Sequence, residues 1–343
     1  MNGYQRYKSM LTGKPVDHLP RTPIVMQYAA EHIGSDYAAF ASDFRVLVQA
    51  NETCAKEFGF DQLSCISDPY RETHGFGSAI TYVSDGPPRS THPLEDTKDL
   101  STLANPNPMS SERMRDRIDA VEAYLQRFQG EYSILGWVEG PAAEAADLRN
   151  PMPFLMDLMD DGAFACELMD RCVEVGIDFA QAQIEAGADT VGIGDAIVSQ
   201  IDPVTYERLI LPREKRLVQA VQEMGAFAKL HICGNITHLL PGISELNVDI
   251  LDVDHMVDLK TVRDAVGKGV AIAGNVDPVG VVKKGTSADI REAVRNAYAE
   301  VGNPFLVNAG CEIPSGTPVE NLKALCESVA YSATGRRNKE QRQ

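Results

Sequence analysis

Residues 226–233, AFAKLHIC, form a short apolar run that ends in a histidine and a cysteine. Seven further runs of similar length and of apolar or β-branched character occur along the chain. They are TPIVMQ (22–27), QLSCIS (62–67), YSILGWV (132–138), TVGIGD (190–195), DILDVD (249–254), VAIAGNV (270–276) and PFLVNAG (304–310). Short apolar runs that are bounded by turn residues are typical of buried strands, so the sequence predicts eight of them.

Amphipathic stretches of helical length separate most of these runs. Examples are FRVLVQANETCAKEF, SERMRDRIDAVEAYLQRF, DPVTYERLILPREKRLVQAVQEM and SADIREAVRNAYAEV. Alternating strands and helices imply an α/β fold with parallel strands and right-handed crossovers, and eight such units favour a (β/α)8 TIM barrel over an open doubly wound sheet. The first run along the chain, residues 22–27, is also not followed by a glycine-rich dinucleotide fingerprint. An open α/β sheet remains the alternative.

The regular spacing is interrupted once, between the second and third runs. Residues 69–110 contain GSAITYVSDGPPRSTHPLED, which predicts a β-hairpin, and then LANPNP, which predicts a proline- and asparagine-rich loop. Long excursions of this kind are often functional, so we expect this hairpin near the mouth of the barrel. We interpret residues 1–335 as a single barrel domain that carries this insertion, and residues 336–343 as a flexible basic tail.

Composition excludes several classes of partner. The 343 residues carry a formal charge of −17, which argues against nucleic acid or an anionic membrane because both attract clustered cations. Residues 1–20 contain no apolar signal core, and no run approaches the ~18 apolar residues of a membrane span. The seven cysteines are an odd number without a dense framework. We therefore expect a reduced, cytoplasmic protein, in which a cysteine near a histidine indicates metal binding or catalysis.

In a barrel, the residues just beyond the carboxyl end of each strand face one mouth. Here these positions hold many side chains of the ligand or acid/base type. They are Gln27, Asp68, Glu139, Asp195, His231 with Cys233, Asp254 with His255, Asn275 with Asp277, and Cys311 with Glu312. Loops are polar in general, so the number of such residues carries little weight by itself.

The three residues His231, Cys233 and Cys311 give a sharper signal. A His-x-Cys pair is too closely spaced for most zinc fingers or ribbons, so a third ligand has to come from a distant part of the chain. Alternate side chains of a strand share a face, so His231 and Cys233 can face one metal together. Cys311 directly follows the eighth run, from which it would reach the pair across the mouth. One imidazole and two thiolates suit Zn²⁺ and leave a fourth position open, as in catalytic zinc sites. The alternative is two buried free cysteines and a hydrogen-bonded core histidine.

Several longer motifs complete this pattern. They are GKPVDHLPRTPIV, GFDQLSCISDPYRETHGFG, HICGN, AIAGNVDPVGVVKKGT and NAGCEIPSGTPVENLKAL. With them the chain resembles, nearly end to end, the uroporphyrinogen decarboxylase superfamily, and within it the zinc-dependent methylcobamide methyltransferase branch. The resemblance implies a (β/α)8 barrel, which agrees with the strand count.

The resemblance also implies a function and a ligand set. His231, Cys233 and Cys311 match the zinc ligands of the methyltransferase branch, whose members move a methyl group between a small molecule and the cobalt of a corrinoid on a separate protein. Glu312 is then a candidate to complete the zinc shell, and Asp195 and Glu139 are candidates for substrate positioning. Three further residues are candidate cofactor-binding residues: Asn275, Asp277 and His255. No DxHxxG corrinoid-carrying motif occurs in this chain, so the corrinoid protein is expected to be a partner.

Two rival functions remain. The first is decarboxylation of a porphyrin-like substrate, which the resemblance to the superfamily supports. Against it, this chain lacks the arginines that such an enzyme carries after the first strand, since the segment here reads PIVMQYAAEHIG. The second is a non-catalytic barrel with a structural zinc. Thiols, methylamines, methanol-derived methyl groups and methoxylated aromatics are all compatible with the methyltransferase reading, in either direction of transfer.

Overall fold

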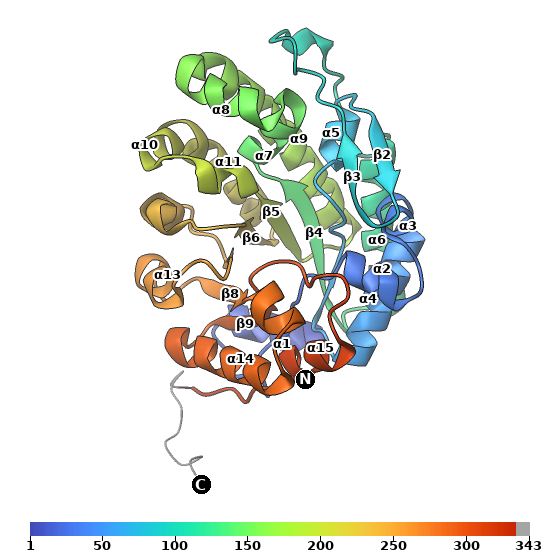
Figure 1. The fold of residues 1–343 in the computed structure, drawn as a ribbon, viewed down its shortest axis with the longest axis vertical. Helices are drawn as coiled ribbons and strands as arrows, with labels where there is room; N and C mark the ends of the chain where they lie inside the picture. The colour runs from blue at the N-terminus through green and yellow to red at the C-terminus, as the bar shows by residue number, and fades with distance from the viewer. Residues whose placement is uncertain (334–343) are drawn as a thin grey trace.

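A computed structural model describes residues 1–333. Its centre is a sheet of seven parallel strands in the order β1-β4-β5-β6-β7-β8-β9, which curls into a barrel surrounded by helices (Figure 1). The strands are β1 (Gln62–Ser64), β4 (Ser133–Glu139), β5 (Thr190–Gly194), β6 (Phe227–Ile232), β7 (Ile250–Val253), β8 (Ala271–Val276) and β9 (Phe305–Ala309). The predicted α/β barrel is confirmed. Each of these strands coincides with one of the predicted runs, and only β4 extends beyond its run, by one residue.

The prediction of a strand at residues 22–27 was wrong in detail. This part of the chain is extended but forms only an isolated parallel bridge, between Arg21 and Val307. It still lies between the two ends of the sheet, because Thr22 N–H donates to Val307 O at 2.9 Å and Asp61 N–H donates to Arg21 O at 2.9 Å. Prolines 20 and 23 have no N–H to donate, so a continuous ladder cannot form. The segment therefore occupies the place of the eighth strand without being one.

Helices cover the outside of the barrel and the loops at its ends (Figure 1). The α-helices are α1 (Gly3–Leu11), α2 (Gln27–His32), α3 (Tyr37–Ser42), α4 (Phe44–Phe58), α5 (Arg71–Gly75), α6 (Glu112–Phe128), α7 (Pro141–Arg149), α8 (Pro151–Asp160), α9 (Gly162–Ala186), α10 (Pro203–Thr205), α11 (Leu211–Glu223), α12 (Leu240–Ser244), α13 (Leu259–Val266), α14 (Ser287–Val301) and α15 (Val319–Leu325). Short 3₁₀ or π turns are η1 (Leu100–Thr102), η2 (Ala196–Gln200), η3 (Tyr206–Ile210), η4 (Thr237–Leu239) and η5 (Pro278–Lys283).

The helix predicted over residues 202–224 is divided into α10, the π turn η3 and α11. Pro212 lies in the first turn of α11. Proline has no N–H for the bond to the carbonyl four residues earlier, so the chain accommodates it by a local change of helical pitch and a new helix start. The other helical predictions match α4, α6 and α14 to within one residue.

The predicted hairpin is present as β2 (Ile80–Val83) and β3 (Gly86–Ser90), which pair antiparallel. The hairpin turn contacts the helices α2 and α3, which follow residues 22–27. Gln27 Nε2 donates to Asp85 O at 3.2 Å, and Tyr37 N–H donates to Ser84 O at 3.0 Å. In Figure 1 the hairpin stands beside α3. The predicted basic tail, 336–343, lies outside the described residues. Among residues 1–333 the helices are too short or too polar to cross a membrane.

Within residues 1–333 the buried apolar side chains form two separate clusters. A large core packs the outer faces of the strands against the helices and includes Ile134 and Val138 of β4. The alternate residues of the same strand, Leu135 and Trp137, belong to a smaller cluster with Ile24 and Ile66. Because alternate strand residues face opposite sides, this smaller cluster lies inside the barrel. It forms an apolar floor below the carboxyl ends of the strands.

Candidate metal centre

His231, Cys233 and Cys311 lie together at the carboxyl ends of β6 and β9. Their ligand atoms are all within 4.8 Å of one another. His231 Nε2 lies 3.1 Å from Cys233 Sγ, which lies 3.6 Å from Cys311 Sγ. Ligands around a tetrahedral zinc, with metal–ligand bonds of about 2.0 to 2.3 Å, are separated by roughly 3.5 to 3.8 Å. The three side chains therefore fit one Zn²⁺ with small adjustments.

Two glycines allow this approach. Gly234, directly after Cys233, has φ = +90°, a conformation that other residues rarely adopt, and its N–H donates to Asp254 Oδ2 at 3.0 Å. Gly310, directly before Cys311, passes close to the loop that follows β7. A Cβ at Gly310 would lie 2.4 Å from the backbone nitrogen of His255 in that loop. The sequences HICGN and NAGCE thus combine a candidate metal ligand with the glycine that positions it.

The electrostatics of the three residues also fit a cation. A hydrogen bond from the Cys233 thiol lowers the pKa of Cys311 to about 4, although burial opposes this, and His231 contributes in the same direction. The same hydrogen bond and burial raise the pKa of Cys233. The centre therefore stabilises a thiolate even without a metal, and thiolate is the form in which cysteine binds zinc. Both cysteines are half-buried, so one side of the centre is accessible.

Trp137 lies below the centre, with its ring centroid 6.3 Å from that of His231. The indole lies across β5, where glycines replace side chains. A Cβ on Gly192 would lie 2.2 Å from Trp137 Cε3, and one on Gly194 would lie 2.9 Å from Cζ2. The GIG motif of β5 is therefore required by the volume of this ring. Tyr28, in α2, packs away from the centre against His32 and Phe58.

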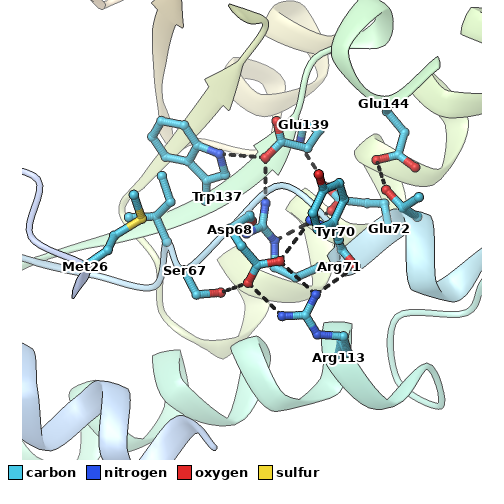
Figure 2. A network of polar contacts seen from close by, with 12 residues as sticks. Met26, Ser67, Asp68, Tyr70, Arg71, Glu72, Arg113, Trp137, Glu139 and Glu144 are labelled. Atoms are coloured by element: carbon cyan, nitrogen blue, oxygen red, sulfur yellow. Dashed lines mark hydrogen bonds and ion pairs between the residues drawn. The ribbon is translucent and has the colours of Figure 1, made fainter. Parts of the chain in front are cut away.

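A network of buried charges adjoins Trp137 (Figure 2). Glu139 accepts hydrogen bonds from Trp137 Nε1 at 3.1 Å and from Arg71 Nη2 at 2.7 Å. Arg113 pairs with Asp68 at 2.7 Å. Burial raises the pKa of Glu139 well above its usual range, although Arg71 opposes the shift. The two arginines are at most 5% exposed. Their charges are therefore paired with these buried carboxylates and not with solvent.

The two other candidate carboxylates differ in their surroundings. Glu312 Oε1 accepts a hydrogen bond from the backbone N–H of Gln27 at 2.8 Å, and burial raises its pKa to about 7. Among the described residues, the metal-capable cluster contains the histidine and the two cysteines but not this glutamate. Asp195 is fully buried and accepts the N–H of Ala143 at 2.7 Å, at the start of α7. The structure thus gives Asp195 the contacts of a helix cap.

The three candidate cofactor-binding residues lie together to one side of the centre. His255, Asn275 and Asp277 line an open pocket of about 330 Å³ that α14 closes from outside. His255 Nδ1 lies 2.7 Å from Asp254 Oδ1, and Asn275 Nδ2 donates to Val257 O at 2.8 Å. Asp277 accepts the N–H groups of residues 279 and 280 and so caps η5.

Several buried polar residues near the centre were not predicted from the sequence. Arg71 and Lys229 are each only 1% exposed, and Asp252 is fully buried. A lysine within the otherwise apolar run AFAKLHIC, two residues before His231, was the available signal, because alternation places both on one strand face. Arg71 offered no such signal, since it lies in a loop helix whose position depends on the tertiary fold.

Comparison with known proteins agrees with this geometry. The family model described as uroporphyrinogen decarboxylase (URO-D) matches residues 3–331. A methylcobamide:CoM methyltransferase MtbA of Methanosarcina mazei is 28% identical over 94% of this chain and 96% of its own length. A uroporphyrinogen decarboxylase of Anaeromyxobacter sp. is 26% identical over 94% of this chain and 97% of its own length.

The solved structures give the same fold. A methyltransferase from Methanosarcina mazei superposes with a TM-score of 0.86 at 23% identity and covers 95% of this chain and 97% of its own. A B12-independent methionine synthase from Shewanella superposes with a TM-score of 0.56 at 13% identity and covers 91% of this chain and 95% of its own. The family model spans nearly all of the described residues, so the resemblance seen in the sequence is confirmed. The chain belongs to the uroporphyrinogen decarboxylase family.

Proposed function

We propose that this protein transfers a methyl group between a small molecule and the cobalt of a corrinoid that a separate protein carries, with one Zn²⁺ bound by His231, Cys233 and Cys311. The observation that carries the proposal is the close approach of these three ligand atoms at an accessible barrel mouth. The named activity of the Methanosarcina relatives, methylcobamide:CoM methyltransferase, supports it. A cytoplasmic location fits this chemistry, which needs reduced thiols.

When bound, Zn²⁺ acts as a Lewis acid that lowers the pKa of a substrate thiol or stabilises a methylated leaving group. The protein's own contribution is a fixed and poorly hydrated place for the reaction. Trp137, with Met26 half-buried against the same inner cluster, excludes water from below. In-line displacement of a methyl group gains mainly from such orientation and needs little acid/base catalysis.

The carboxylates have supporting roles in this proposal. Glu312, directly after Cys311, is held by the Gln27 N–H and would be the candidate fourth zinc ligand when substrate is absent. Glu139 is oriented by Trp137 and Arg71 and positions the substrate beside the centre. Asp195, directly after β5, accepts the N–H of Ala143 and so holds the start of α7, the helix that follows β4. We assign contact with the corrinoid to the pocket of His255, Asn275 and Asp277.

The first experiment measures the zinc content of the purified wild type and of the variants His231→Ala, Cys233→Ser and Cys311→Ser. We expect about one zinc per chain in the wild type and a large loss in each variant, since each removes one of the three ligands. Cys166→Ser is the matched control, because Cys166 is also half-buried but lies on α9, outside the cluster. A wild type that folds without binding zinc would contradict the proposal.

The second experiment tests the reaction. Zinc-loaded protein is incubated with methylcobalamin and a panel of thiols, and loss of the methyl–cobalt absorbance is followed. Turnover with at least one thiol, abolished by Cys311→Ser and retained by Cys166→Ser, is the expected result. Zinc-independent loss of carboxyl groups from a porphyrinogen would instead support the decarboxylase, an activity named for other relatives. Stable zinc binding without turnover of either kind would favour a structural zinc.

A further inference from the structure

Asp252, in the middle of β7, lies inside the barrel directly behind His231. It is fully buried. Its Oδ2 is 2.7 Å from Lys229 Nζ and 3.5 Å from His231 Nδ1. Asn308 Nδ2 donates to both carboxylate oxygens at 3.1 Å. The carboxylate thus contacts a cation, an amide and the imidazole at the same time.

The strand register explains why these groups meet. In the parallel pairing of β6 with β7, His231 lies opposite Asp252, so their side chains share one face of the sheet. Lys229 is two residues before His231 and points to the same face. Asn308 comes from β9, the strand that leads to Cys311. One carboxylate therefore connects the two strands that supply the metal ligands.

The two nitrogens of the imidazole face different partners. Nε2 lies on the metal side, 3.1 Å from Cys233 Sγ, while Nδ1 lies 3.5 Å from Asp252 Oδ2 and is buried without another hydrogen-bond partner among residues 1–333. A histidine that binds metal through one nitrogen commonly donates the N–H of the other to a carboxylate, which fixes the tautomer and strengthens the donor nitrogen.

We propose that Asp252 is the positioning residue of the metal centre: it accepts the Nδ1–H of His231 and so holds Nε2 free of its proton and directed at the metal. Lys229 keeps Asp252 ionised, and Asn308 fixes the plane of its carboxylate. A buried ion pair contributes little to stability once desolvation is counted, so a Lys229–Asp252 pair inside the barrel is better explained by this orienting role. The inference rests on the zinc centre of the proposed function.

The test compares the zinc affinities of the wild type and Asp252→Asn, measured by competition with a chromophoric chelator. We expect the variant to bind zinc about 10 to 100 times more weakly. Asp61→Asn is the matched control, because Asp61 is also buried and ion-paired, with Arg6 and Arg21, but does not contact the three ligands. An unchanged affinity in Asp252→Asn, or an equal loss in Asp61→Asn, would overturn the inference.

A second measurement needs no variant and covers the case in which Asp252→Asn does not fold. Nitrogen-15 NMR of histidine side chains in the zinc-loaded wild type should show a proton on Nδ1 of His231 and none on Nε2. The reverse tautomer would refute the role of Asp252 while leaving the zinc centre intact. A wild type that binds no zinc would instead refute the proposed function, and this inference with it, so the two failures are distinguishable.

Discussion

The thiol sulfurs of Cys233 and Cys311 lie 3.6 Å apart, although the two residues are 78 positions apart in the chain. One follows β6 and the other follows β9, and two further strands lie between these in the sheet. They approach because the curled sheet brings the carboxyl ends of its strands to one mouth. A metal bound there would link distant parts of the barrel, which leads to the first two predictions.

Zinc should raise the thermal stability of the metal-free protein. A ligand that is present at 100 times its Kd and binds only the folded state stabilises it by about 2.7 kcal/mol. For a chain of this length the unfolding entropy near Tm is about 0.7 kcal/mol/K, so Tm should rise by about 4 °C. Calorimetry of the metal-free wild type and Cys166→Ser should show this rise. It should be absent in Cys311→Ser; a similar rise there would mean that zinc binds elsewhere.

Metal-free protein should form a Cys233–Cys311 disulfide when it is treated with diamide, which accepts the two electrons and two protons that the thiols lose. The hydrogen bond from Cys233 lowers the pKa of Cys311 to about 4. Cys311 is therefore a thiolate at neutral pH, the form that attacks in disulfide formation. Peptide mapping by mass spectrometry should find the linked pair, and prior zinc loading should prevent it. Linkage of Cys233 to any other cysteine would contradict the close approach of its thiol to that of Cys311.

Gly192→Ala should disturb the floor of the centre. The added Cβ would lie 2.2 Å from Trp137, and overpacking of this kind costs about 1 to 3 kcal/mol of unfolding free energy. Trp137 is the single tryptophan of the chain, so its fluorescence should shift as the indole moves. Gly86→Ala is the matched control, because it also lies in a strand but a Cβ there meets no atom within 4 Å. Equal spectra and stabilities for the two variants would refute the contact.

Arg71→Met should destabilise the protein strongly. Arg71 is 1% exposed and its Nη2 lies 2.7 Å from Glu139 Oε1, and removal of one partner of a buried ion pair costs about 3 to 5 kcal/mol. Arg45→Met should cost less than about 1 kcal/mol, since the Arg45–Asp43 pair is on the surface. Urea unfolding measures both. In Arg71→Met, a second change of Glu139→Gln should restore part of the loss, because it removes the unpaired charge.

The unfolding free energy should fall as the pH rises from about 4 to 6.5, partly through Asp189. Burial raises its pKa from 3.8 to about 6, although hydrogen bonds from Ser133, Ile134 and Thr190 oppose this. The folded state therefore binds the proton more tightly than the unfolded state, and this contribution is complete below pH 4 and is lost as the pH passes 6. It amounts to roughly 2 to 3 kcal/mol.

Asp189→Asn tests this pH dependence, since asparagine does not titrate. Urea unfolding at several pH values should show a smaller decline for the variant than for the wild type. Parallel curves would mean that the carboxyl group has an ordinary pKa in the folded protein.

Most strands of the fold could be predicted from local sequence. Seven of the eight predicted strands are present, because buried parallel strands are continuous apolar runs that need no knowledge of their neighbours. The failure at residues 22–27 came from prolines 20 and 23, which leave an extended segment without the N–H groups of a full ladder. The hairpin β2–β3 was predicted from its turn residues, and its position by the mouth followed from the barrel.

The sequence by itself also indicated the candidate metal ligands, because His231, Cys233 and Cys311 are chemically distinctive and lie at strand ends. It could not identify their surroundings. Asp252 behind His231, and Arg71 beside Glu139, belong to strands and helices distant in sequence. Only tertiary structure decides which side chains share the inside of a barrel, because strand register and sheet curvature set those contacts and local sequence encodes neither.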